Sequence, residues 1–80
     1  MPKLRVLSAD DLLALFIDFG FSVVAQKGSH IKLQRNTPTG KQTLTIPNHK
    51  ELDTGTTKAI YRQSLRYIAE EQLQPRFYTE

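Results

Sequence analysis

The clearest secondary-structure pattern of the chain lies in the segment FSVVAQKGSHIKLQRNTPTGKQTLTIP, residues 21–47. Residues 21–26 are rich in aromatic and β-branched side chains and end at Lys27-Gly28, a pair suited to a tight hairpin turn. Residues 30–34 alternate between apolar and polar side chains, and residues 43–46 alternate again after a turn signal at residues 36–40. These patterns predict a three-stranded antiparallel sheet with one apolar face.

A helix is expected before this sheet. Ser8 is followed three residues later by Asp11, which is the pattern of a capped helix start. Apolar side chains between Leu12 and Phe19 form one broad face, and Gly20 predicts the end of the helix.

A second helix is expected after the sheet. Asp53 or Thr54 can cap it, and its pattern continues to about Gln72. Pro75 predicts a stop to any helix, so residues 73–80 are interpreted as a C-terminal extension.

The predicted fold is therefore α+β, in the order α-β-β-β-α, with two helices on one face of the sheet. Eighty residues allow one domain, which we assign to residues 1–80. The other face of the sheet remains open to solvent and carries polar side chains from the second and third strands: His30, Lys32, Gln34, Thr43 and Thr45.

Composition excludes several classes of protein and site. With 39% hydrophobic and 24% charged residues the chain should fold, and without cysteine it has no disulfide, zinc thiolate or cysteine nucleophile. The sequence contains no apolar run long enough to cross a membrane and no phosphate-binding glycine loop, so a cytoplasmic protein without a cofactor is expected. Its two histidines have no adjacent carboxylates, which argues against a metal site.

Positive charge is concentrated in the middle of the chain. Between Phe19 and Ala69 there are eight basic residues and only two acidic ones, although the whole chain has a net charge of +3. Three of the basic residues recur every four positions and would form a stripe on the second helix: Lys58, Arg62 and Arg66. Such a surface favours the binding of an anion such as single-stranded RNA. The simpler alternative is a solvated surface of mixed charge that binds nothing.

A histidine on an open, basic sheet face can take part in RNA cleavage. The reference pKa of imidazole, about 6.5, allows proton exchange at neutral pH. A base that removes the ribose 2′-OH proton, together with cations near the phosphate, is sufficient for modest cleavage. The simplest alternative is that His30 has no such role.

Several separated motifs occur in order between Ser8 and Gln63: Gly20-Phe21, Gln26-Lys27-Gly28-Ser29-His30, Ile46-Pro47-Asn48-His49-Lys50-Glu51-Leu52, Gly55-Thr56 and Ile60-Tyr61-Arg62-Gln63. In these motifs the chain resembles the HicA-type toxins of bacterial toxin–antitoxin pairs. The resemblance implies a fold like that of a double-stranded-RNA-binding domain and a metal-independent endoribonuclease of a type II pair, which inhibits translation by cleaving mRNA. It also implies that His30 is catalytic and that a HicB-type antitoxin blocks the site. The chain departs from the family at Asp18, where a basic residue is common.

The remaining candidates are assigned around His30. Gly28 permits the turn, and His49 is expected to have a structural rather than a catalytic role. The residues expected to contact RNA are Lys27, Ser29, Lys32, Lys50, Lys58, Arg62 and Arg66. Two other functions remain open, which are a non-catalytic RNA-binding module and a protein-interaction domain whose sheet edge accepts a partner strand.

Overall fold

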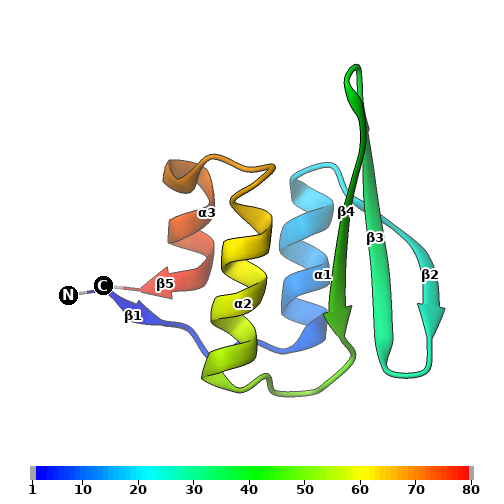
Figure 1. Cartoon of the computed structure of the whole chain (residues 1–80). Helices are drawn as coiled ribbons and strands as arrows, with labels where there is room; N and C mark the ends of the chain where they lie inside the picture. The colour runs from blue at the N-terminus through cyan, green and yellow to red at the C-terminus, as the bar shows by residue number, and fades with distance from the viewer. Residues whose placement is uncertain (1, 80) are drawn as a thin grey trace.

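A computed structural model describes residues 2–79 of the chain. In this range the elements follow in the order β1 (Lys3–Leu4), α1 (Ala9–Asp18), β2 (Ser22–Lys27), β3 (His30–Thr37), β4 (Gly40–Pro47), α2 (Thr54–Ser64), α3 (Glu70–Phe77) and β5 (Tyr78–Thr79). Figure 1 shows the sheet of β2, β3 and β4 on one side of the molecule and the helices beside it. The predicted α+β fold and its three-stranded antiparallel sheet are confirmed.

The strands of the sheet run in the order β2-β3-β4. β2 has the predicted length, shifted by one residue, whereas β3 and β4 are longer than their local patterns predict. β3 and β4 pair from His30↔Pro47 to Thr37↔Gly40, so that only Pro38 and Thr39 form the turn. The Thr37 hydroxyl donates to the Gly40 carbonyl over 2.8 Å and stabilises this narrow end. The predicted turn at residues 36–40 is therefore shorter, and the hairpin projects past the helices (Figure 1).

The start and end of α1 follow the sequence pattern. The Asp11 amide donates to the Ser8 hydroxyl at 3.1 Å, and the Ser8 amide donates to the Asp11 carboxylate at 2.9 Å. These two bonds satisfy backbone donors that have no partner within the helix. Gly20 follows the C-cap with φ of +94°, a conformation in which glycine avoids the strain of a side chain.

The single second helix predicted to about Gln72 is wrong, because the chain forms two helices there. The backbone turns at residues 65–69, where the amides of Tyr67 and Ile68 both donate to the Ser64 carbonyl over 2.9 Å. This turn buries Ile68 and redirects the chain toward the core.

The expected stop at Pro75 is also wrong, because Pro75 lies inside α3. Proline removes a helical hydrogen bond and is unfavourable in a helix interior. Here Leu73 and Phe77 of the same short helix are both completely buried. Their burial supplies the apolar contact that favours the helix despite the proline.

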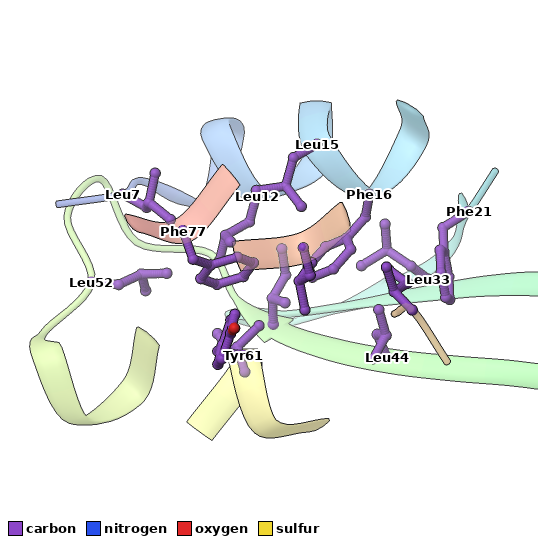
Figure 2. Close-up of a cluster of buried hydrophobic side chains, with 14 of the residues drawn as sticks. Leu7, Leu12, Leu15, Phe16, Phe21, Leu33, Leu44, Leu52, Tyr61 and Phe77 are labelled. Atoms are coloured by element: carbon purple, nitrogen blue, oxygen red, sulfur yellow. The ribbon is translucent and has the colours of Figure 1, made fainter. Parts of the chain in front are cut away.

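The core lies between the apolar face of the sheet and the three helices (Figure 2). Phe77 joins the helices, because its ring centroid lies 6.2 Å from that of Phe16 in α1 and 5.1 Å from that of Tyr61 in α2. After α3, β5 pairs with β1 in the register Lys3↔Thr79. The segment interpreted as a C-terminal extension thus contributes core residues and a strand.

Candidate active site

The alternation of β3 places His30 on the open face of the sheet. Ile31 and Leu33 are 4% and 0% exposed and pack in the core, whereas His30 and Lys32 are exposed. Successive side chains of a strand point to opposite faces, so His30 and Lys32 share the face that the helices leave open.

Strand register determines the neighbours of His30. It pairs with Lys27 on β2 and with Pro47 on β4, and directly opposed residues present their side chains on the same face. Lys32, two residues further along β3, pairs with Ala25 and Thr45 on that face. The structure thus brings together His30, Lys27 and Lys32, as the sequence analysis expected.

The turn before His30 consists of Gly28 and Ser29, with Lys27 as the last residue of β2. Gly28, the first turn residue, has φ of +59°, whereas Ser29, the second, does not have a positive φ. This combination is that of a type II′ turn. The Ser29 carbonyl accepts a hydrogen bond of 2.6 Å from the Asn48 amide, so the turn is fastened to the loop after β4. Sequence reasoning missed this contact because a bond between two backbones leaves no side-chain signal.

The loop after β4 brings Lys50 and His49 to the same end of the sheet. Together with Ser8, Ala9, Asp10 and Asn48 they line a hollow of about 220 Å³. The His49 carbonyl accepts a 2.9 Å hydrogen bond from the Ala9 amide at the start of α1. The backbone of His49 therefore holds the loop against α1, while its side chain is exposed.

The basic stripe expected on one helix is not formed as predicted. Lys58 and Arg62 are exposed on α2, but Arg66 lies in the turn at residues 65–69, because the helix ends at Ser64. Two of the three cations therefore share a helix.

Arg35 has a structural role that the sequence did not reveal. Its guanidinium donates to the carbonyls of Phe19 and Tyr67 over 2.7 and 2.9 Å and to the Gln42 side chain over 2.8 Å. It also lies 4.8 Å from the centre of the Phe21 ring. These contacts connect α1, the sheet and the turn after α2, so Arg35 is engaged within the fold.

Two other titratable side chains are also engaged in the fold. Asp18, which departs from the family pattern, forms an ion pair of 2.9 Å with Arg76 of α3. Burial raises the pKa of the Tyr61 phenol, and the nearby Glu70 charge adds to the increase. Tyr61 therefore remains neutral in the core.

Within residues 2–79 there is no cluster of three histidine or acidic side chains that could bind a metal ion. Among the described helices, none has the length and apolar character needed to cross a membrane.

Most of the chain matches the model of a known protein family. The model of a family described as the HicA toxin of bacterial toxin-antitoxin matches residues 9–65, well over half of the chain. The chain belongs to the HicA toxin family. In this HicA family member the match covers α1, the whole sheet with His30, and α2, but not β1, α3 or β5. No curated protein and no solved structure matched the chain significantly.

Proposed function

We propose that this toxin is a metal-independent endoribonuclease that cleaves mRNA and thereby stops translation, with His30 as its proton-transfer group. The observation that supports this most is the exposed histidine on an open sheet face between Lys27 and Lys32. No acidic residue occurs from Phe19 to Lys50, so these cations have no carboxylate neighbour within the sheet.

The proposed reaction begins with His30 accepting the proton of a ribose 2′-OH. The 2′ oxygen then forms a bond to the adjacent phosphorus, and the bond from phosphorus to the 5′ oxygen breaks. The leaving 5′ oxygen takes a proton from the protonated histidine or from water. Lys27 and Lys32 stabilise the negative charge that develops on the phosphate oxygens. The products are a 2′,3′-cyclic phosphate and a 5′-hydroxyl.

The other basic residues extend the proposed RNA contact beyond the reacting phosphate. Ser29 precedes His30 in the turn, and Lys50 lies in the loop after β4, whose Asn48 amide donates to the Ser29 carbonyl. Three basic residues farther from His30 would attract the RNA strand in a salt-dependent manner. These residues are Lys58, Arg62 and Arg66. A HicB-type antitoxin would complete the pair, and both proteins would act in the cytoplasm.

A non-catalytic RNA-binding module is the second candidate. Lys41 pairs with Asn36 and so lies on the same open face as Lys27 and Lys32. This positive face would attract RNA whether or not His30 transfers a proton.

The test is cleavage of a synthetic single-stranded RNA in the presence of a chelator, with analysis of the product ends. His30→Ala should lower the rate 10²- to 10⁴-fold, the usual contribution of general acid–base catalysis. The free energy of unfolding should change by no more than about 0.5 kcal/mol, because the side chain is exposed. His49→Ala is the matched control and should retain most activity.

Cleavage at the wild-type rate by a folded His30→Ala protein would exclude this mechanism. RNA binding without cleavage by the wild-type chain would favour the second candidate.

A further inference from the structure

The two edges of the sheet are covered differently. β4 has α2 beside it, and its Thr45 amide lies 3.4 Å from the Gln63 side-chain oxygen of that helix. β2 is the other edge, and within residues 2–79 no further strand pairs with it. All six of its residues are exposed, and Figure 1 shows β2 as the outermost strand, away from α2 and α3.

β2 exposes apolar side chains as well as backbone groups. Val23 and Val24 are 47% and 49% exposed, although neighbouring strands bury their apolar residues almost completely. A β-bulge at Val24 leaves this residue without a partner on β3. In a two-residue hairpin the residues flanking the turn bond to each other, so the Gln26 amide and carbonyl point outward.

Charge restricts what can pair with this edge. The segment from Phe19 to Lys50, which has no acidic residue, contains four lysines that are exposed on or beside the sheet: Lys27, Lys32, Lys41 and Lys50. Its fifth basic residue, Arg35, is engaged in the fold. A second copy of β2 has Lys27 and no acidic side chain, so it would offer these lysines no opposite charge. A strand with acidic and apolar side chains complements both the lysines and the valines.

We propose that the outer edge of β2 binds an acidic, apolar strand of the HicB-type antitoxin, which extends the sheet to four strands. This inference rests on the antitoxin partnership proposed above. Adjacent strands lie about 4.8 Å apart, so the added strand would be about 10 Å from β3. Long acidic side chains on its open face can reach Lys27 and cover His30. Pairing at the edge thus inhibits the toxin without contact with the core.

Binding of the cognate HicB-type antitoxin, measured by calorimetry, tests the proposal. Val24→Asp should weaken binding at least 10-fold, because it places a negative charge against the acidic strand and removes an apolar contact. Val6→Asp is the matched control, since Val6 is 73% exposed and lies outside the sheet, and it should change binding less than twofold. Unfolding curves should be unchanged for both, and Val24→Ser, which adds no charge, should weaken binding to a smaller extent.

Hydrogen exchange of the complex provides a second measurement. The Gln26 amide should become protected, whereas α1 should not change. Unaltered affinity of a folded Val24→Asp protein, or protection restricted to α1, would overturn the proposal.

Separate controls distinguish this result from failure of the proposed function. Cleavage of RNA without antitoxin should be the same for Val24→Ser, which adds no charge, and wild type. Absence of cleavage by both would contradict the nuclease but leave the binding result valid. Loss of RNA binding in Val24→Ser would assign the edge to RNA, and self-association of the wild type that Val24→Asp abolishes would assign it to a second copy. Either outcome would overturn the proposal.

Discussion

The two faces of the sheet differ in burial and in charge, although their residues alternate along the same strands. Leu33 is fully buried and packs against the helices, while the adjacent Lys32 is exposed. The same contrast separates Ile31 from His30. Because strand side chains alternate with period two, stability and charge are encoded at neighbouring positions. Substitutions one residue apart should therefore change different properties of this toxin.

The largest expected effect is on the core that covers the apolar face. Phe77→Ala should lower the free energy of unfolding by about 3–5 kcal/mol, because it removes a fully buried ring that contacts Phe16 and Tyr61. Urea denaturation followed by circular dichroism measures the change. Val6→Ala, at an exposed site, is the control. A loss below about 1 kcal/mol would show that α3 is not required by the core.

A matched pair on β3 tests the two faces directly. Leu33→Ala should cost about 2–5 kcal/mol of stability, whereas Lys32→Ala should cost no more than about 0.5 kcal/mol. Lys32→Ala should instead lower RNA affinity or cleavage about 10- to 100-fold, since a charged contact to phosphate contributes about 1.5–3 kcal/mol. Denaturation curves and cleavage rates, corrected for the folded fraction, measure both properties. Equal loss of stability in the two variants would contradict the separation of the faces.

The weakest of these effects concerns the N-terminal cap of α2. Hydrogen bonds of 2.6 and 3.1 Å from the Thr56 hydroxyl and amide lower the pKa of Asp53 below its ordinary value of 3.8. The cap therefore stabilises the fold fully above pH 3.8 and loses this contribution as the pH falls through the lowered pKa. Asp53→Asn should remove this component from the pH dependence of unfolding while cleavage at neutral pH persists. Parallel stability profiles from pH 2 to 7 would contradict the assignment.

Local sequence patterns predicted much of the three-stranded sheet and the starts of α1 and α2. The Ser8-Asp11 capping box, the Asp53 cap and the alternation of β3 each depend on residues within four positions of one another. The exposure of His30 beside Lys27 followed from the same alternation and from the short turn at Gly28. Short-range geometry can be derived from a sequence because few conformations satisfy it.

The α+β class, the apolar face of the sheet and the position of His30 on the opposite face could thus be predicted from the sequence. The turn of the chain at residues 65–69, the place of Pro75 within a helix and the burial of Phe77 in the core depend on the folded structure. The folded structure also shows that Arg35 bonds to the fold rather than extending the basic surface. These outcomes depend on contacts between residues far apart in the chain, such as Arg35 with Tyr67. Burial and hydrogen bonding at such contacts outweigh weak local propensities. These long-range contacts cannot be predicted from the pattern of neighbouring residues.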